Sequence, residues 1–304
     1  MTGGGLEVLD PGPLTTVQDA GRPGLAHLGI PPSGALDRPG AALANRLVGN
    51  PESAAVLETT VRGPRLRVTC PAQHVVVVAV AGAAAEVVVD GRVQASHVAL
   101  HLRAGSVLEV GLAGTGIRSY LAVRGGLDVE PVLGSRSHDL LSGLGPPPLI
   151  AGQVLTIGPS GGPGSGPVPA LDVPPLPAVD SSAVLDVLAG PRQDWFADEA
   201  LALLTGTAWR VSPASNRIGL RLSGPPLRRV RHAQLPPEGL VTGAIQVPQD
   251  GQPVLFLADH PTTGGYPVLA VADEAGLPIA AQARPGSILR FRAARATRWP
   301  PPRR

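Results

Sequence analysis

The sequence VVVVAVAGAAAEVVVDGRVQASHVALHL, residues 75–102, consists of short apolar runs separated by glycine and polar turns. Valine dominates these runs, and β-branched residues pack well on the pleated surface of a strand. Similar runs recur at 107–110, 119–123, 218–222, 254–257 and 288–291. Short strands at intervals of about ten residues are typical of barrels and sandwiches. The sequence therefore predicts an all-β fold.

A few short helices are expected between the strands. Segment 36–47 begins near Asp37, whose carboxylate can accept backbone N–H bonds as an N-cap, and ends before a Gly-Asn-Pro turn. Segment 195–204 follows Asp194 and ends before a glycine in the same way.

Two domains are predicted, because 304 residues are enough for two hydrophobic cores. Residues 160–180 are dense in glycine and proline, and we interpret them as the linker. The predicted domains are residues 1–175 and 183–304. A hydrophobic content of 43% with 16% charged residues argues against disorder, although glycine and proline are frequent.

The chain contains no lysine, so arginine and histidine supply all of its basic side chains. This composition excludes a Schiff base, a P-loop lysine and a biotin attached through a lysine of this chain. If biotin takes part in the reaction, another polypeptide or domain must carry it.

Charge and hydropathy exclude further classes of function. The net charge is only +2 and aromatic residues make up 3%, which leaves little for base stacking, so no nucleic-acid partner is predicted. The apolar run 75–85 is too short to span a bilayer. Residues 1–15 lack a basic start followed by an apolar core, so no membrane partner and a cytoplasmic location are expected.

A first polar segment lies near the start of the chain. It places an amide, a carboxylate and a guanidinium close together as Gln18, Asp19 and Arg22. Arg22 either binds a carboxylate or phosphate in a bidentate manner or pairs with Asp19 to fix a loop. Ser33 and Gly34 lead into the helix near Asp37, where free N–H groups form either an anion site or a plain cap. The candidate binding residues here are Gln18, Asp19, Arg22, Ser33, Gly34 and Asp37.

A second polar segment lies in the second half. Arg217 is a candidate contact for a carboxylate or carboxyl-biotin, with a buried salt bridge as the alternative. Asp259 could orient a neighbouring group, and Gln246 could direct its amide into a cavity. Threonines and glycine amides in 262–266 could bind an oxyanion. The candidate catalytic residues are Arg217, Asp259 and Gln246, and the candidate binding residues add Asn216, Gly243, Thr262, Thr263, Gly264, Gly265 and Tyr266.

Other reactive sites are not indicated. No Gly-x-Ser-x-Gly elbow, Walker A motif or dinucleotide fingerprint is present. The histidines lack metal-ligand spacing, so no metal is expected.

Several motifs in a fixed order resemble the carboxyltransferase subdomain A and B family. They are LTTVQDAGR at 14–22, HLGIPPSGALD at 27–37, LVGNPE at 47–52, YLAVRGG at 120–126, GSRSHDL at 134–140, SNRIG at 215–219, EGLVTGAIQVP at 238–248 and DHPTTGGYP at 259–267. The chain departs from the family pattern at Ile218, where methionine is frequent, and in the tail after Arg292. The resemblance covers nearly the whole chain.

The resemblance implies two cyclophilin-like β-barrels, subdomain A-like for the first domain and B-like for the second. It also implies a component of an ATP-dependent 5-oxoprolinase that opens 5-oxoproline to glutamate. One partner would be an allophanate hydrolase subunit 1-like protein, which is KipI-like and forms the B component of 5-oxoprolinase. The other would be the lactam-utilisation protein that forms the A component. The ATP site would be composite or lie in a partner. The family also includes the carboxyltransferase region of urea carboxylase and the regulatory protein KipA. Two alternatives are therefore a carboxyltransferase that acts on urea with biotin in trans, and a non-enzymatic KipA-like binding protein.

Overall fold

The computed structural model describes residues 4–159, 164–169 and 182–294. The chain divides into two compact units, residues 1–179 and 180–304. Each unit is built mainly from strands, which confirms the predicted all-β class with a few short helices. The predicted linker, residues 160–180, lies outside the described residues except for 164–169.

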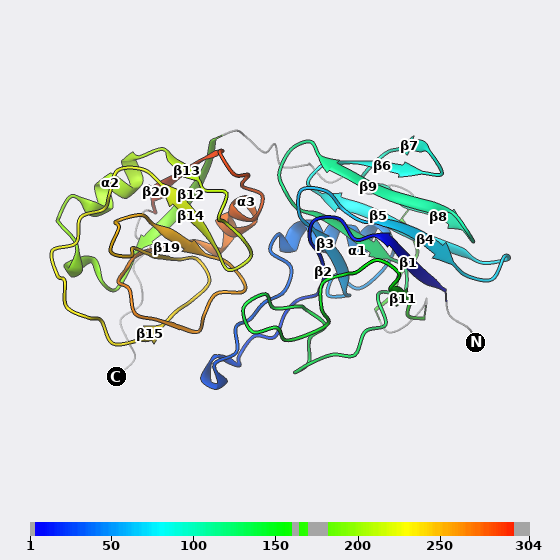
Figure 1. Ribbon diagram of the computed structural model, residues 1–304, viewed down its shortest axis with the longest axis horizontal. Helices are drawn as coiled ribbons and strands as arrows, with labels where there is room; N and C mark the ends of the chain where they lie inside the picture. Colours follow the sequence, from blue (N-terminus) through cyan, green and yellow to red (C-terminus); the bar gives the residue numbers. More distant parts are fainter. Residues whose placement is uncertain (1–3, 160–163, 170–181, 295–304) are drawn as a thin grey trace. The chain divides into compact units, whose positions relative to one another are not determined.

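The first unit contains two antiparallel sheets (Figure 1). One sheet has the strand order β11-β1-β4-β9-β6-β7 and the other β2-β3-β10-β5-β8, so within the described part of this unit the strands form two sheets and no closed barrel. Its elements are β1 Gly5–Asp10, β2 Thr15–Gln18, the 3-10 helix η1 Ala26–Leu28, α1 Arg38–Leu47, β3 Val56–Thr59, β4 Arg65–Thr69, β5 Val75–Gly82, β6 Ala85–Val89, β7 Arg92–Gln94, β8 Leu100–Arg103, β9 Val107–Ala113, β10 Ser119–Val123 and β11 Val154–Thr156.

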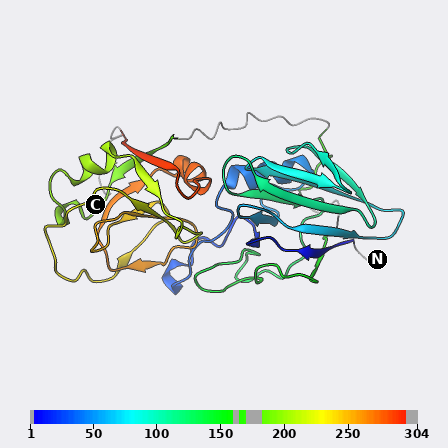
Figure 2. The ribbon, with the colours of Figure 1, turned by 45° about the horizontal axis from the view of Figure 1, so that its top comes forward.

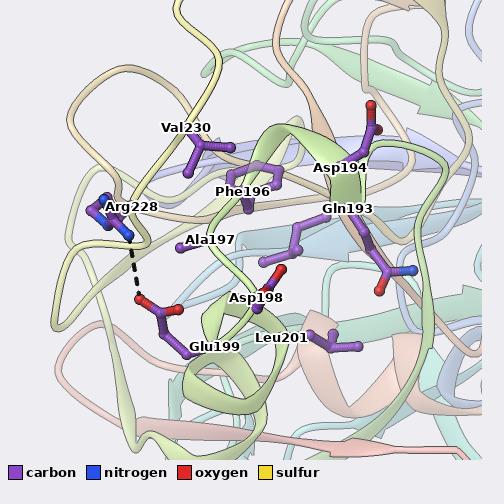
Figure 3. A pocket seen from close by; sticks show the side chains of 10 residues that line it. Gln193, Asp194, Phe196, Ala197, Asp198, Glu199, Leu201, Arg228 and Val230 are labelled. Atoms are coloured by element: carbon purple, nitrogen blue, oxygen red, sulfur yellow. Dashed lines mark ion pairs between the residues drawn. The ribbon is translucent and has the colours of Figure 1, made fainter.

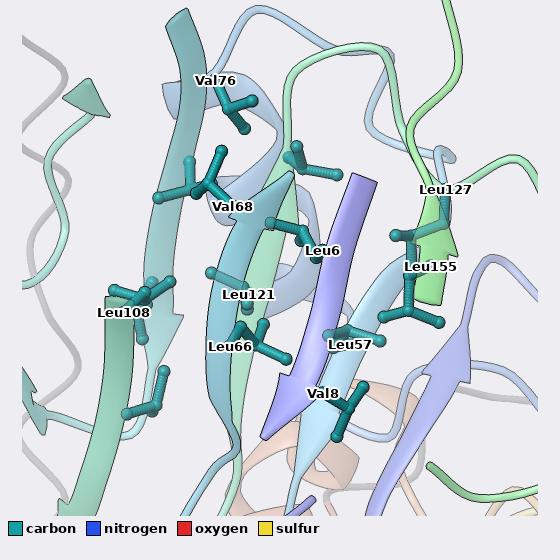
Figure 4. Close-up of a cluster of buried hydrophobic side chains, with 14 of the residues drawn as sticks. Leu6, Val8, Leu57, Leu66, Val68, Val76, Leu108, Leu121, Leu127 and Leu155 are labelled. Carbon is teal, nitrogen blue, oxygen red and sulfur yellow. The ribbon is translucent and has the colours of Figure 1, made fainter. Parts of the chain in front are cut away.

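The main core of this unit lies between the two sheets (Figure 4). Strands β1, β4 and β9 contribute Leu6, Leu66 and Leu108 from one sheet, while β3 and β10 contribute Leu57 and Leu121 from the other. All five side chains are at most 2% exposed. Burial of this size from both sheets is the main stabilising contribution to the unit.

Helix α1 covers the opposite face of the second sheet (Figure 2). Successive side chains of a strand point to opposite faces. In β5, Val78 and Val80 therefore face the core between the sheets, whereas Ala79 and Ala81 face α1. The small alanines let the helix approach the sheet closely. As predicted, Asp37 is the N-cap of α1, and its carboxylate accepts a hydrogen bond from the amide of Gly40.

The second unit is a closed barrel of seven strands in the order β12-β19-β16-β17-β14-β13-β20. The first strand, β12, pairs in parallel with the last, β20, and this pair closes the barrel. The closed barrel expected for the second half is thus present. Its elements are β12 Ser182–Ala189, η2 Gln193–Trp195, α2 Ala200–Gly206, β13 Trp209–Val211, β14 Gly219–Ser223, β15 Glu238–Gly239, β16 Ala244–Gln246, β17 Val254–Phe256, β18 Thr263–Gly264, β19 Val268–Ala272, η3 Glu274–Gly276, α3 Leu277–Ala281 and β20 Ile288–Ala293.

The helix expected at 195–204 is shorter than predicted. Phe196 has an extended backbone and forms a β-bridge with Arg229, which separates η2 from α2. Across the described ranges, no helix has the length and apolar character needed to cross a membrane.

Candidate functional site

Asp19 organises a loop that lies far from it in sequence. One carboxylate oxygen accepts hydrogen bonds from the amide of Gly21 at 2.8 Å and from the hydroxyls of Ser135 and Ser137 at 2.6 Å each. The other oxygen accepts from the amide of Arg136 at 2.6 Å. Both oxygens of this carboxylate thus accept hydrogen bonds from the protein, three on one oxygen and one on the other. Asp19 therefore holds the two segments together.

Arg22 binds the same loop from the other side. Its side chain is buried, its Nε donates to the carbonyl of Val132 at 3.3 Å, and its Nη2 donates to the carbonyl of Ser137. Its Nη1 is buried without a hydrogen-bond partner among the described residues. Within that part of the chain Arg22 does not pair with Asp19, so that alternative is wrong, while binding of a carboxylate or phosphate by Arg22 stays a prediction.

Gln18 is fully buried, with 0% of its surface exposed. Its Nε2 donates to the Thr16 hydroxyl at 3.0 Å and to the carbonyl of His138 at 2.9 Å. These two acceptors define the orientation of the amide, because a flipped amide would point its oxygen at the carbonyl. The Oε1 atom is buried and has no donor in the described part of the chain.

Ser33 and Gly34 form a tight turn before α1. Both have positive φ angles, 51° and 93°. A Cβ on Gly34 would lie 2.9 Å from the amide nitrogen of Gly21, so glycine is required at this close approach. The Ser33 hydroxyl is buried and donates to the carbonyl of His138 at 3.1 Å. The turn is therefore joined to the same loop as Gln18.

The amides before α1 donate to Glu58 and Tyr120, which are not among the candidate site residues. The amide of Leu36 donates to Glu58 at 2.9 Å, and the amide of Asp37 donates to the Tyr120 hydroxyl at 2.7 Å. Tyr120 in turn donates to Glu58 at 3.0 Å. Burial and the nearby Glu58 carboxylate raise the pKa of Tyr120 well above its usual value. The only sequence signal for this network is a carboxylate at the end of an apolar run.

A cavity of about 220 Å³ lies beside this segment. Gln18 and Asp19 form part of its wall, together with the first turns of α1. Arg38, the first residue of α1, is exposed at this cavity and has no ion-pair partner in the described ranges. The lining residues are Gln18, Asp19, Ala20, Ala35, Arg38, Ala41, Ala42, Glu52, Ser53, Ala54 and Val56.

In the second unit, Arg217 and Asp259 form a buried bidentate ion pair. Nε and Nη2 of Arg217 donate to the two carboxylate oxygens at 2.8 and 3.0 Å. The side chains are 1% and 0% exposed. The backbone joins them as well, because the amide of Asp259 donates to the carbonyl of Arg217. The geometry matches the buried salt bridge that the sequence analysis gave as the alternative to ligand binding by Arg217.

Asn216 shapes the turn that enters β14. Its side-chain oxygen accepts hydrogen bonds from the amides of Ile218 at 2.8 Å and Gly219 at 3.3 Å. This is a local side-chain-to-backbone turn of the kind that asparagine favours. Asn216 therefore serves the local backbone of this turn.

The predicted oxyanion loop is part of a two-stranded ribbon. Thr263 and Gly264 form β18 and pair with Gly239 and Glu238 of β15, and the carbonyl of Thr262 accepts from the amide of Leu240. The backbone of this loop thus takes part in pairing with the 238–240 segment.

Gln246 attaches this ribbon to the barrel. It is 3% exposed, and its Nε2 donates to the carbonyl of Tyr266 at 2.8 Å. A Cβ on Gly264 would lie 2.6 Å from this nitrogen, so the amide occupies the space that a side chain would need. Gly265 and Tyr266 are exposed at the end of the ribbon. Gly243, with φ of 89°, donates its amide to the carbonyl of Phe256 and links the ribbon to β17.

A larger cavity of about 500 Å³ in the second unit involves none of the predicted site residues (Figure 3). Two ion pairs involve its acidic residues: Arg228 lies 3.9 Å from Glu199, and Arg231 lies 2.9 Å from Asp194. The cluster of arginines at 228–231 is the sequence signal for this surface. The cavity is lined by Gln193, Asp194, Phe196, Ala197, Asp198, Glu199, Leu201, Arg228, Val230 and Leu269.

The structure thus brings four predicted residues of the first unit together at one loop. Gln18, Asp19, Arg22 and Ser33 all contact the loop 132–138, whereas Arg217 pairs with Asp259 and Gln246 contacts the 264–266 segment. In the described residues there is no group of three or more His, Cys, Asp or Glu side chains that could hold a metal ion.

Comparison with known proteins connects both units to one family. The model of the carboxyltransferase domain, subdomain A and B, matches residues 28–293. The C component of 5-oxoprolinase from Escherichia coli is 35% identical over 94% of this chain and 90% of its own length. The corresponding protein from Haemophilus influenzae is 30% identical and is covered over 91% of its length. Urea amidolyase from Lachancea kluyveri is 34% identical, but the chain spans only 17% of it.

Solved structures support the same relationship. The structure of TTHA0988 is similar with a TM-score of 0.84 and 36% identity over 95% of this chain, which spans about half (55%) of that protein. Urea amidolyase from K. lactis is similar with a TM-score of 0.83 and 31% identity over 96% of this chain and 19% of its own. Since the family model covers most of both units, the chain belongs to the carboxyltransferase domain family of subdomains A and B.

Proposed function

We propose that this chain is one subunit of a multi-component, ATP-dependent enzyme that opens 5-oxoproline to glutamate. The observation that carries the proposal is the extent of the match to the C component of 5-oxoprolinase, which is covered over 90% and 91% of its length in two bacteria. The urea amidolyases are far longer, and the chain spans only 17% and 16% of them. The near-complete match to the C component of 5-oxoprolinase favours the 5-oxoprolinase-type assembly.

The proposed role is that of a binding subunit that depends on its partners for turnover. Several polar residues that could have served catalysis are engaged in contacts within the chain: Asp19 has four donors, and Arg217 is paired with Asp259. The partners in this proposal are an allophanate hydrolase subunit 1-like protein and a lactam-utilisation protein of the type that forms the A component of 5-oxoprolinase. ATP would bind to a partner or at an interface between the components, and the assembly would work in the cytoplasm.

Reconstitution tests the proposal. The chain is purified alone, with each partner and with both, and glutamate release from 5-oxoproline is measured with and without ATP. We expect ATP-dependent glutamate release only from the full assembly. Equal turnover by the isolated chain would contradict the dependence on partners, and an inactive full assembly that contains all three folded proteins would contradict the reaction.

A biotin-dependent carboxyltransferase acting on urea is the second candidate, because the urea amidolyases are 32% and 34% identical over 94% of this chain. The absence of lysine requires the biotin to be attached to a residue outside these 304. The same assemblies are therefore given urea, bicarbonate, ATP and a biotinylated carrier protein. Urea-dependent ATP consumption that requires the carrier would favour this candidate. A stable complex without turnover of either substrate would favour the KipA-like regulatory role.

A further inference from the structure

We propose that the outward-facing side of β13, β14 and β20 docks an acidic surface of a partner protein, and that Arg210, Arg221 and Arg290 bind its carboxylates. This surface is called the arginine face below. The partner is the allophanate hydrolase subunit 1-like protein, so the inference rests on the proposed function and adds the surface through which the two proteins meet.

The three arginines lie on neighbouring strands of the closed barrel (Figure 1). In β13, the exposed Arg210 stands between the buried Trp209 and Val211, so its side chain points away from the barrel interior. The same alternation exposes Arg221 in β14 and Arg290 in β20. All three side chains therefore lie on the outside of the barrel.

The strand register makes the three arginines neighbours. Arg210 is opposite Ser223 of β14 and Ile288 of β20, and both pairings are antiparallel. Arg221 and Arg290 are each two residues from those positions, on the same face of the sheet, so each is a diagonal neighbour of Arg210. Diagonal neighbours are about 7–8 Å apart, a distance that long side chains can span. The three side chains therefore form one contiguous group.

No carboxylate neutralises this group within the described ranges. Arg210 donates to the carbonyl of Gly286 at 3.0 Å, and none of the three arginines forms an ion pair with a described residue. Asp186 of β12 is the only acidic residue in these strands and the adjoining β12. It is already bound by Arg292 at 2.6 and 2.8 Å. The arginine face thus keeps its positive charge.

Arginines on the strands of the first unit are arranged differently. Arg67 lies 2.9 Å from Glu7 of the neighbouring strand, and Arg65 is opposite Glu109. Like charges on neighbouring positions destabilise a sheet, and mixed charges are sufficient for solubility. A surface of carboxylates docked on the arginine face would remove the repulsion between its guanidiniums.

Aliphatic side chains beside the arginines favour a protein over a nucleic acid as the occupant. Val184 and Leu188 of β12 are 42% and 47% exposed, and Val184 pairs with Arg290 across the sheet. A protein partner can cover such side chains while its carboxylates bind the guanidiniums, and arginine is enriched in protein interfaces. A nucleic acid offers phosphates but usually also stacks its bases on aromatic side chains. The aromatic residues of these strands, Trp209 and Phe291, are buried.

Calorimetric titration of the purified full-length chain with the purified partner tests the arginine face. Arg210→Glu combined with Arg290→Glu should weaken binding by about tenfold or more, because reversed charges repel the carboxylates. The milder pair Arg210→Gln and Arg290→Gln should give a smaller loss in the same direction. Raising the salt concentration from about 50 to about 200 mM should weaken binding of the unchanged chain more than that of the variants.

A matched control makes the same change in net charge elsewhere. Arg92→Glu combined with Arg103→Glu reverses two exposed arginines on β7 and β8 of the first unit, and neither forms an ion pair with a described residue. This control should bind the partner as the unchanged chain does. Circular dichroism shows whether each variant is folded.

The outcomes separate this inference from the proposed function. If the folded Arg210→Glu and Arg290→Glu chain binds the partner as tightly as the control does, the arginine face is wrong, while the proposed reaction is unaffected. If the partner does not bind the unchanged chain, both the inference and the assembly are wrong. If the complex depends on these arginines but the complete assembly does not open 5-oxoproline, the docking surface stands and the proposed reaction fails.

Two further measurements test other occupants. Sedimentation of the chain alone shows whether two copies associate, and titration with a short DNA duplex shows whether nucleic acid binds. Self-association or DNA binding that is lost in the Arg210→Glu and Arg290→Glu chain, together with unchanged partner binding, would overturn the inference.

Discussion

The segment around Gln18 and the pair formed by Arg217 and Asp259 are both buried and polar, yet they differ in how their polar atoms are satisfied. In the second unit the guanidinium meets a carboxylate through two hydrogen bonds. In the first unit Arg22 donates to backbone carbonyls, and Gln18 keeps an oxygen without a donor in the described residues. In the second unit both carboxylate oxygens of Asp259 accept from Arg217, whereas in the first unit the side-chain oxygen of Gln18 is buried without a donor in the described residues.

This difference shows that a polar motif in the sequence does not distinguish scaffold from binding site. Both segments contain an arginine, a carboxylate and an amide, and both were predicted to bind ligand from that composition. The hydrogen bonds of the buried polar atoms distinguish the two segments, because the Gln18 oxygen lacks a donor in the described residues whereas both Asp259 oxygens have one. The following predictions test whether the comparison is correct.

The largest effect is expected for Arg217→Met, which leaves Asp259 buried and without its cation. Such a change costs about 3–5 kcal/mol of the free energy of unfolding. Chemical denaturation of the variant measures it. The matched control is Arg292→Met, because Arg292 forms a bidentate pair with Asp186 on the surface of the same unit and should change stability far less. If folded Arg217→Met keeps the original stability but the assembly loses activity, Arg217 binds ligand and the comparison fails.

A smaller but clear loss is expected for Gly21→Ala in the Gln18 segment. Gly21 has φ of 83°, and a Cβ would lie 2.5 Å from the carbonyl oxygen of Pro32. Gly24 has φ of 87° but open space around its Cβ position. Gly24→Ala should therefore cost only the conformational strain, about 1–2 kcal/mol, and Gly21→Ala should cost more. Equal unfolding free energies for the two variants would show that the turn adapts and does not hold Gln18 in place.

Tyr120→Phe tests the support of α1 beside the cavity. The change removes the hydroxyl that accepts from the amide of Asp37 and donates to Glu58, and it should cost about 1–3 kcal/mol. Tyr266→Phe is the control, because Tyr266 is 44% exposed. A Tyr120→Phe chain that is as stable as the control would mean that Glu58 alone holds the start of the helix.

The smallest effect is expected at high pH. Burial and Glu58 raise the pKa of Tyr120, so the folded chain keeps this proton at a pH where the unfolded chain loses it. This contribution to stability is complete below the unfolded pKa of about 10 and is lost progressively above it. The decline in unfolding free energy between about pH 10 and 11 should be steeper in the unchanged chain than in Tyr120→Phe. If the unfolding free energies of the two chains decline in parallel with pH, the raised pKa of Tyr120 is contradicted.

The regular elements were largely predictable because their signals are local. The valine-rich run at 75–80 is part of β5, and Asp37 caps α1 as its sequence position indicated. The short helix α3 was missed, although its signal is present: Asp273 accepts from the amide of Ala275 before η3, and a proline follows in the first turn of α3. The helix expected at 195–204 is interrupted because Phe196 pairs with Arg229, a contact that no local pattern reveals.

The partners of the candidate residues could not be predicted, because they come from distant segments. Gln18 and Asp19 lie in the motif that was selected, but their contacts with His138 and Ser137 depend on the fold of the intervening strands. The Arg217–Asp259 pair was expected only as an unspecified buried salt bridge of Arg217, and the structure shows that it is bidentate and fully buried. Residue types therefore locate the polar segments, while three-dimensional contacts determine which hydrogen-bonding atoms of each residue are already used within the chain.

The parallel pair of β12 and β20 has a consequence for the order in which the second unit folds. The barrel joins its first strand to its last, so this closing contact spans nearly the whole unit in sequence. Long-range pairing of this kind slows folding, because the entropy of loop closure is lost before the contact forms. During synthesis the barrel cannot close until β20 has left the ribosome. Before that point, β12 and β13 lack their partner strand and present unpaired edges. A chain truncated before Ile288 would keep those edges and should aggregate.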